Sequence, residues 1–280
     1  MSRLTLTSHL SLKCLVPSQN PNFTAIRLGD IDHIKRMMMA EPAALSTVIR
    51  GGYTLLHCAA RYGRHDILSI LVANGADINT TNDRGETPLH IAIKQGQDHA
   101  RVQHLLELGA HPSQPDSEGR TALHMFYNPI MTYMFQFHST EIDTWAQDIE
   151  GRTVLHYLAW SSRSTTQELT RCLQSVDTPQ LSIKDSEGRS ILHYAAQRGN
   201  TEFINFLLGL PGAATLCMPD YHDRTLLHHA TESGRVHTID LFLARQIDPD
   251  ALDDQGRTML HHACQWGNLK ATAKELLSVQ

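Results

Sequence analysis

Apolar residues recur at helical spacing in short segments separated by polar turns, and this pattern repeats along most of the chain. The clearest copy runs from Asn82 to His111 and opens with a turn whose Gly85 can take the positive φ that a tight turn requires. Its apolar positions predict a first helix that ends at Gly96 and a second that ends at Gly109. Two such short helices cannot bury a core alone, so we expect neighbouring copies to stack on one another.

The first helix of this copy has a well-marked start. Thr87 can accept a backbone hydrogen bond as the N-cap, and Pro88 occupies the first helical position, where a missing N–H costs nothing. His90, three residues after Thr87, can reach back toward the cap. The sequence therefore predicts a capping box in which an imidazole replaces the usual Glu or Gln.

The same helix start recurs along the chain at intervals of 32 to 37 residues. The Thr or Ser residues that open the predicted first helices are Thr54, Thr87, Thr121, Thr153, Ser190, Thr225 and Thr258. The histidines three residues later are His57, His90, His124, His156, His193, His228 and His261. A leucine precedes every one of these histidines, and five of the seven are followed by an Ala two residues later and a Gly six residues later.

This period and the Thr-Pro-Leu-His-x-Ala signature resemble the ankyrin-repeat family, and the resemblance covers residues 22 to 280. The chain departs from the family in one respect, because only the Thr87 copy keeps the proline at the first helical position. The resemblance implies an all-α ankyrin-repeat solenoid of stacked helix–turn–helix units joined by β-turn or hairpin tips. It also implies protein recognition through a concave groove that the tips and the first helices line.

For domain organisation, we expect a loosely ordered leader over residues 1–21 and an ankyrin-repeat array over residues 22–280. A mitochondrial transit peptide is an alternative for the leader, although its prolines disfavour an amphipathic helix. A capping repeat is expected at 22–50, and the further repeats are expected to start near residues 51, 84, 118, 150, 187, 222 and 255. The amphipathic segment 268–278 suits a terminal cap, and the alternative is that the chain is a fragment of a longer array.

The repeats over residues 118–186 depart most from the pattern. Phe126 and Leu158 replace the small alanine, Pro129 ends a first helix early, and a polar linker over 161–166 stands where a glycine is expected. Large residues at close helix contacts change the stacking angle. We therefore predict a weak seam in the middle of the array, which proteases cut first near residues 160 to 182.

Composition and charge narrow the function classes. The 280 residues are 41% hydrophobic, which suffices for a stacked core, and the formal net charge is −5 with no basic run. We therefore expect no direct binding to nucleic acid and none to membranes. The five cysteines are far apart and form no Cys-x-x-Cys pair, which favours an intracellular location in the cytoplasm, the nucleus or both. We expect no cofactor and a monomeric protein.

The eighteen histidines invite a metal or catalytic interpretation, and seven of them are the capping histidines. His229 and His262 occupy the same position in adjacent repeats, and packed helices lie about 8–10 Å apart, so both rings could converge on one metal. No carboxylate or thiol at a fixed helical spacing completes a ligand set, and the sequence has no His-Glu-x-x-His motif. A metal-binding or enzymatic protein that uses these two histidines is kept as the alternative hypothesis.

An arginine stands just before the Thr or Ser marker in five successive repeats, which predicts a ladder along one edge of the stack. Arginine suits carboxylates, so an acidic segment of another protein is the expected partner. In the alternative interpretation, acidic residues of the same turns neutralise the ladder; they are Glu118, Glu150, Glu187 and Asp223. Large aromatics at first-helix positions often anchor interfaces. The candidate partner-binding residues are Tyr62, Arg120, Arg152, Trp160, Arg189, Arg198, Arg224, Arg257 and Trp266.

The predicted function is a non-enzymatic adaptor or scaffold for protein–protein interaction that binds its partner through the groove of the stack. No catalytic residue is predicted. The family resemblance suggests a regulatory subunit or a transcriptional coregulator as a specialisation of this function.

Overall fold

The computed structural model describes residues 20–96, 98–125, 143, 145–161, 181–210 and 212–268. It forms two compact units, Met1–Ala110 and His111–Gln280, and each unit is described by itself. Most of the expected leader, the seam residues Phe126 and Pro129, and most of the 161–166 linker lie outside the described residues.

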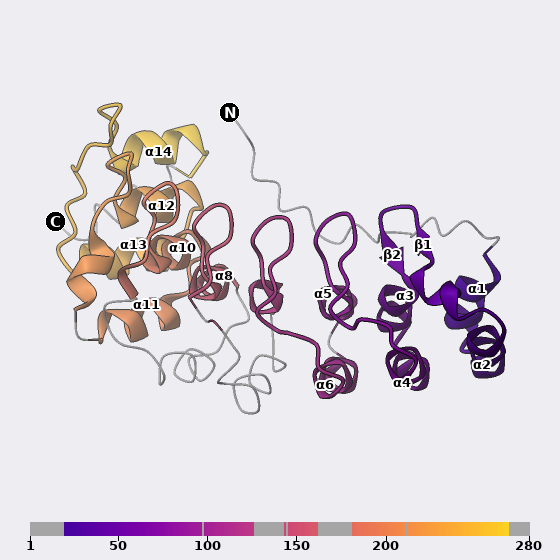
Figure 1. Cartoon of the computed structure of the whole chain (residues 1–280). Helices are drawn as coiled ribbons and strands as arrows, with labels where there is room; N and C mark the ends of the chain where they lie inside the picture. Colours follow the sequence, from indigo (N-terminus) through magenta and orange to yellow (C-terminus); the bar gives the residue numbers. More distant parts are fainter. Residues whose placement is uncertain are drawn as a thin grey trace. The chain divides into compact units, whose positions relative to one another are not determined.

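The described part of the first unit is a stack of helix pairs (Figure 1). Its elements are α1 (Pro21–Leu28), α2 (Ile31–Ala40), the 3₁₀ helix η1 (Pro42–Ser46), β1 (Val48–Ile49), β2 (Tyr53–Thr54), α3 (Leu55–Tyr62), α4 (His65–Ala73), α5 (Pro88–Lys94) and α6 (His99–Glu107). The first helices contact each other in the order α1, α3, α5, and the second helices in the order α2, α4, α6. The strands β1 and β2 pair antiparallel, with Val48 opposite Thr54, and form one hairpin tip.

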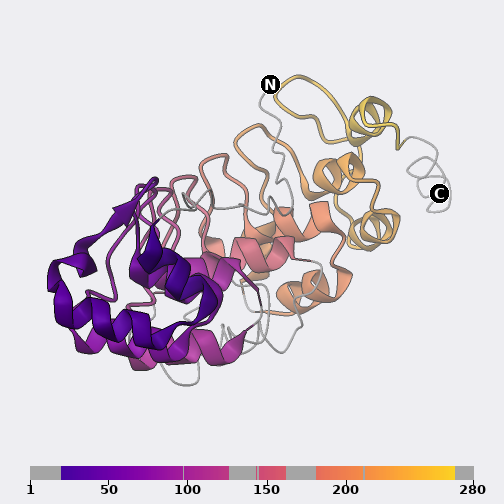
Figure 2. The same ribbon diagram turned by 90° about the vertical axis from the view of Figure 1, so that its right-hand side faces the viewer.

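The described part of the second unit has the same plan (Figures 1 and 2). Its elements are the 3₁₀ helices η2 (Ala122–Met125) and η4 (Ala213–Cys217), and the α-helices α8 (Val154–Trp160), α10 (Ile191–Arg198), α11 (Thr201–Leu208), α12 (Leu226–Glu232), α13 (Val236–Leu243) and α14 (Met259–Gln265). The first helices contact each other in the order α8, α10, α12, α14, and the second helix α11 contacts α13.

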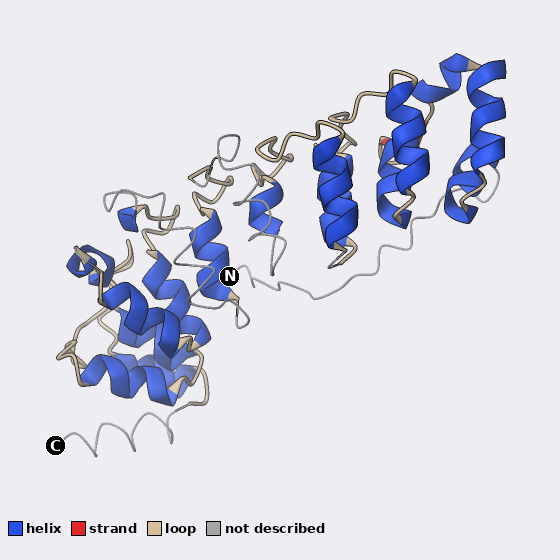
Figure 3. Cartoon of the chain, turned by 90° about the horizontal axis from the view of Figure 1, so that it is seen from below, coloured by secondary structure: helices blue, strands red, loops and turns tan. Residues whose placement is uncertain are grey.

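Helices dominate both units, and the only strands among the described residues are the two short ones of the hairpin (Figure 3). The predicted all-α architecture of stacked helix–turn–helix repeats is therefore confirmed. In the first unit, α1 begins at Pro21 with the side chain of Asn20 as its N-cap, so the helix starts inside the segment expected as leader.

The core lies between neighbouring repeats. The alanine two residues after the capping histidine is fully buried in five repeats, where it lets adjacent first helices approach closely; these residues are Ala59, Ala92, Ala195, Ala230 and Ala263. Leu158 stands at this position in α8 and is only 2% exposed. The larger side chain is therefore part of the buried core.

The glycine after a first helix is required for two separate reasons. Gly63 and Gly199 have φ values of 64° and 74°, in the left-handed region that L side chains rarely adopt. A Cβ atom on Gly63 would also lie 2.8 Å from the guanidinium of Arg101, and one on Gly199 would lie 2.7 Å from the side chain of Arg235. Because Gly63 has no side chain, the guanidinium of Arg101 lies close to the backbone there and donates a hydrogen bond to the carbonyl of Arg61, at the end of the preceding repeat's first helix.

Candidate functional site

Each capping histidine closes the start of its own helix. In α3, the backbone amide of Thr54 donates to the Nδ1 atom of His57 at 3.1 Å, and the Thr54 side chain accepts from the helix backbone in return. The same capping box is present at α5, α8, α10, α12 and α14. Thr121 and His124 make the equivalent contact at η2. The predicted role of these histidines is confirmed.

The other nitrogen of the ring joins neighbouring repeats, which sequence reasoning missed. Because Nδ1 of His57 accepts a backbone N–H, the neutral ring carries its proton on Nε2 and donates it to the carbonyl of Glu86, 2.8 Å away. The equivalent bonds run from His124 to Arg152, from His156 to Arg189 and from His228 to Arg257, at 3.1, 3.3 and 3.1 Å. The capping histidine is therefore a structural element of the stack.

Burial keeps these rings neutral. It lowers the pKa of His57, His124, His193 and His228 below the ordinary histidine value, and it lowers that of His156 to about 4. A second proton on Nδ1 would abolish its role as acceptor in the capping box. In His57, His124, His156 and His228 both ring nitrogens are engaged in such bonds, and a neutral ring of this kind is unsuited to proton transfer.

A buried aspartate organises each turn of the second unit. Oδ1 of Asp185 accepts from the backbone amides of Glu187 and Arg189, at 3.0 and 2.8 Å. Its Oδ2 accepts from Nε of Arg189 and from the hydroxyl of Tyr194, both at 2.7 Å. In the preceding repeat, Asp148 makes the same set of bonds with its own turn, arginine and tyrosine.

All five arginines of the ladder are paired inside their own turns. The partners are the aspartates four residues earlier, at 2.7 or 2.8 Å; they are Asp116, Asp148, Asp185, Asp220 and Asp253. The arginine side chains are between 10% and 30% exposed. Glu118, Glu150 and Glu187 make second ion pairs with the ladder at 2.7, 2.8 and 3.1 Å, as the neutralisation interpretation expected. The aspartates were missed, although an Asp five residues before the Thr or Ser marker recurs in the sequence.

His229 and His262 take the place of the tyrosine in this turn network. Nε2 of His229 lies 3.0 Å from Oδ2 of Asp220, and Nε2 of His262 lies 2.8 Å from Oδ2 of Asp253. Nδ1 of His262 is 3.0 Å from a carboxylate oxygen of Glu232. The two rings therefore point into separate carboxylates of their own turns and do not converge on one metal. Within the described ranges, no group of three or more His, Cys, Asp or Glu could hold a metal ion.

These contacts shift the pKa values of Asp253 and His262 in the last repeat. Burial opposes ionisation of Asp253, but hydrogen bonds from Arg257 and His262 outweigh it and hold the pKa of this carboxyl well below its usual range. Burial likewise opposes protonation of His262, but its bonds to Glu232 and Asp253 raise its pKa above the ordinary histidine value. The contacts therefore shift the pKa of each group toward its charged form, as expected for neighbouring groups of opposite charge.

Two of the candidate partner-binding residues lie together on neighbouring first helices. The guanidinium carbon of Arg198 lies 4.7 Å from the ring centroid of Trp160, and its Nε donates to the Trp160 carbonyl at 2.7 Å. The Trp160 ring also meets the ring of Tyr194 edge-on, with centroids 6.0 Å apart. The two helices therefore hold this aromatic and cationic pair in a fixed place.

The remaining aromatic candidates are separate from this pair. Trp266 lies just after α14 and is 58% exposed. Tyr62 is the last residue of α3 in the first unit and is half-buried.

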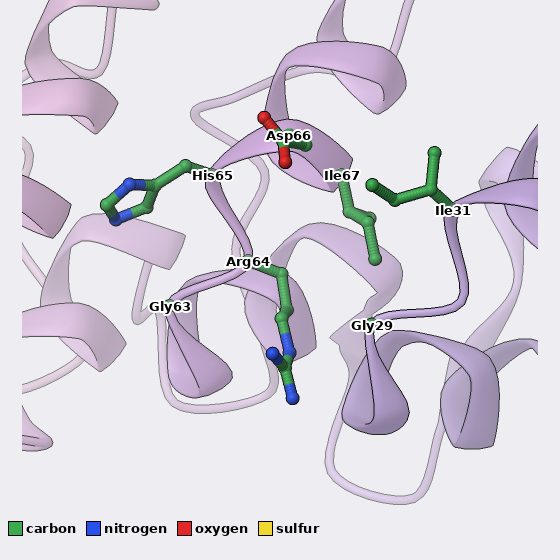
Figure 4. Close-up of a pocket in the computed structure, with 7 residues that line it drawn as sticks. All are labelled: Gly29, Ile31, Gly63, Arg64, His65, Asp66 and Ile67. Carbon is green, nitrogen blue, oxygen red and sulfur yellow. The ribbon is translucent and has the colours of Figure 1, made fainter.

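A pocket of about 290 Å³ lies in the first unit between the loops of adjacent repeats (Figure 4). The side chains of Ile31 and Ile67 face each other there, whereas the ring of His65 points away. The guanidinium of Arg64 donates to the carbonyl of Arg27 at 2.6 Å. The pocket thus mixes apolar, acidic and already bonded basic groups, which favours no one class of ligand.

Comparison with known proteins identifies the family. A family model of three ankyrin repeats matches residues 7–116 and 126–220, and a model of many ankyrin repeats matches residues 224–273. The chain belongs to the ankyrin-repeat family. The resemblance inferred from the capping-box motifs is therefore confirmed, and ankyrin repeats are modules of protein–protein interaction that are typically non-enzymatic.

Curated relatives match parts of this chain. A putative palmitoyltransferase, ZDHHC13, of Danio rerio is 35% identical over 162 residues, which are 55% of this chain and 24% of the relative. Protein phosphatase 1 regulatory subunit 27 of Mus musculus is 37% identical over 95 residues, 34% of this chain and 60% of the relative. Human Rabankyrin-5 is 30% identical over 138 residues, 45% of this chain and 12% of the relative. The chain thus spans less than two thirds of each of these proteins. In the part of the chain that the structure describes, no helix is both long and apolar enough to span a membrane.

Proposed function

We propose that this ankyrin-repeat protein is a non-enzymatic adaptor that binds another protein through the first helices and turn tips of its repeats. The observation that carries this proposal is that the histidines, aspartates and arginines that recur at fixed positions in the repeats are bonded within the protein. The groups that could otherwise perform chemistry are engaged in capping boxes, inter-repeat bonds and turn networks. The first helices and turn tips therefore present their exposed side chains in fixed positions, and such a surface suits the recognition of another protein.

Among the candidate residues, the structure supports different roles. The paired arginines of the ladder shape the surface and hold the turns, because each is bonded to a buried aspartate. Trp160 with Arg198, and the exposed Trp266, are better suited to anchor a partner, since aromatic and arginine side chains supply most of the energy at protein interfaces. In the first unit, Tyr62 is the candidate for contact with a partner.

A regulatory role follows from the same proposal. The similarity to protein phosphatase 1 regulatory subunit 27 supports a regulatory subunit, and a transcriptional coregulator is a second possibility of the same class. We place the protein inside the cell as a monomer that requires no cofactor. Among the described residues, Cys58, Cys217 and Cys264 form no disulfide, which suits a reducing compartment.

Position-specific photo-crosslinking tests this proposal. A benzophenone amino acid replaces Trp266 in one variant and the exposed His237 of α13 in a control variant, and both full-length proteins are irradiated in extract of the cells that express them. The proposal expects a discrete crosslinked protein from position 266 and none from position 237. A crosslink from position 237 alone would place binding on the second helices and overturn the proposal.

A further inference from the structure

The turn tips of the second unit form one continuous edge. The amide of Ile149 donates to the carbonyl of Glu118 in the preceding tip at 2.9 Å, and the amide of Tyr221 donates to the carbonyl of Glu187 at 2.9 Å. Two equivalent bonds join the tips at Ser186 and Asp254 to their neighbours. In Figure 2, the loops that precede the first helices of this unit extend to the same side. We call this edge the tip edge; it consists of the turns at residues 116–120, 148–152, 185–189, 220–224 and 253–257.

The tip edge carries more acid than base. Its basic groups are Arg120, Arg152, Arg189, Arg224 and Arg257, and Lys184 lies beside it, directly before Asp185. Its carboxylates are Asp116, Glu118, Asp148, Glu150, Asp185, Glu187, Asp220, Asp223, Asp253 and Asp254. One aspartate with a fully buried or nearly buried side chain neutralises each arginine. The glutamates are therefore in excess, and their side chains remain 41% to 52% exposed.

Two large apolar side chains stand among these acids. Ile149 is 70% exposed and Tyr221 is 68% exposed. The ring of Tyr221 packs closely on the backbone of Gly188, so closely that a Cβ atom on Gly188 would lie only 2.5 Å from it. Nζ of Lys184 lies 5.7 Å from the centroid of the same ring. Side chains that are fixed before binding lose less conformational entropy in a complex. For Ile149, the bond from its amide to the carbonyl of Glu118 fixes the backbone from which its side chain extends.

We propose that the tip edge of the second unit binds an extended protein segment in which lysines or arginines alternate with apolar residues. This inference rests on the proposed function and specifies the chemistry of the partner. The excess carboxylates attract a basic segment and repel nucleic acid, whose phosphates carry the same sign of charge. The exposed Ile149 and Tyr221 give the segment apolar contacts that a small cation could not use. The acidic partner expected from the sequence stays the opposite prediction, because it would have to compete with the aspartates that pair with the ladder.

The test uses the full chain and a fluorescent peptide of about twelve residues that alternates lysine and valine, against the same peptide with glutamate in place of lysine. The variant Glu118→Gln/Glu150→Gln/Glu187→Gln removes three tip charges and keeps a hydrogen-bonding group beside each arginine. The control Glu202→Gln/Asp248→Asn/Asp250→Asn removes three charges outside the tip edge. Circular dichroism confirms that each variant is folded.

The proposal expects the lysine peptide to bind and the glutamate peptide not to bind. It expects the tip variant to weaken binding of the lysine peptide about tenfold or more, and the control variant to weaken it less than about twofold. Equal losses of affinity in both variants would mean that the peptide is attracted by the net charge of the protein and not by the tip edge. If the lysine peptide does not bind at all, the protein has no site for a basic segment. Either result overturns the proposal.

A second variant tests the apolar contacts. Ile149→Ser/Tyr221→Ser should raise the dissociation rate of the lysine peptide and leave the salt dependence of its affinity unchanged, because apolar contacts are short-ranged. An unchanged dissociation rate would exclude these two residues from the site. If the position 266 crosslink is obtained but the tip variant binds as the unaltered protein does, the proposed function stands and this inference fails.

Discussion

His228 closes one helix and holds the next repeat with the two nitrogens of a single ring. Its Nδ1 accepts from the amide of Thr225 at 3.0 Å, and its Nε2 lies 3.1 Å from the carbonyl oxygen of Arg257. His193, one repeat earlier, makes the same cap with Ser190, but its buried Nε2 interacts with the carbonyl of Arg224 without the geometry of a full hydrogen bond. The two histidines therefore form a matched pair that differs in the strength of the bond to the next repeat.

This difference predicts unequal effects of truncation. His228→Ala removes a cap, a buried ring and the bond to the next repeat, and we expect it to lower the free energy of unfolding by about 3 kcal/mol. His193→Ala removes a cap and a buried ring, so its effect should be smaller by about 1 kcal/mol. Urea denaturation followed by circular dichroism measures both. Equal effects would show that the bond between repeats contributes nothing to stability.

The buried capping histidines also predict loss of stability in mild acid. Their pKa values are lower in the folded protein than in the unfolded chain, so the unfolded chain binds more protons below about pH 6.5. Their contribution is fully present above that pH and is lost as the pH falls toward about 4, the folded pKa of His156. For His156 alone the loss is on the order of 3 kcal/mol. His262 acts in the opposite sense, because its raised pKa stabilises the fold below pH 6.5 and that contribution is lost as the pH rises through its folded pKa.

Urea denaturation between pH 7.5 and pH 5 measures this dependence. The control is His156→Gln, since glutamine is a usual residue of the capping box and does not titrate. We expect this variant to fold and to lose less stability on acidification than the unaltered protein. An identical pH dependence in the two proteins would contradict the assignment of His156 as a neutral, structural residue.

The sequence predicted what depends on residues close to one another along the chain. The Thr-x-x-His spacing identified the capping boxes, because cap and histidine lie within one helical turn. The bond from His57 to Glu86 was not predicted, because its acceptor is a backbone carbonyl 29 residues away, and a carbonyl leaves no mark on the sequence. The contact of Trp160 with Arg198 also joins residues a full repeat apart. Both depend on how the repeats stack.

The arginine ladder shows a different limit. The sequence places the arginines on one edge correctly, but whether they are free depends on the aspartates that turn inward to bind the backbone amides of the same tip. The conformation of the turn determines whether these aspartates point inward. For this reason the sequence indicated an acidic partner, whereas we propose a basic one from the excess of carboxylates on the tip edge.

The hydroxyl of Tyr194 offers a direct test of the turn network. It donates to Oδ2 of Asp185 from a buried position, and Tyr194→Phe removes this bond without leaving a cavity. We expect a loss of about 1–2 kcal/mol, since a buried hydrogen bond to a charged acceptor is lost. Tyr221→Phe is the control, because that ring is 68% exposed, and its effect should be within about 0.5 kcal/mol. A loss of similar size in the two variants would mean that the Tyr194 hydroxyl is not a specific support of the turn.

Arg189 and Asp185 provide the final prediction, because the two side chains are buried and bonded to each other at 2.7 Å. Arg189→Ala leaves a buried carboxylate without its cation and should lower the free energy of unfolding by about 3 kcal/mol. Asp185→Asn removes the charge but keeps an oxygen for the turn amides, so the double variant should be less destabilised than the sum of the single ones by about 2 kcal/mol. A double-mutant cycle in urea measures this coupling energy. Additive effects would mean that Arg189 is not bound to Asp185 in solution, so that only Glu187 and the Tyr194 ring would compete with an acidic ligand of the ladder.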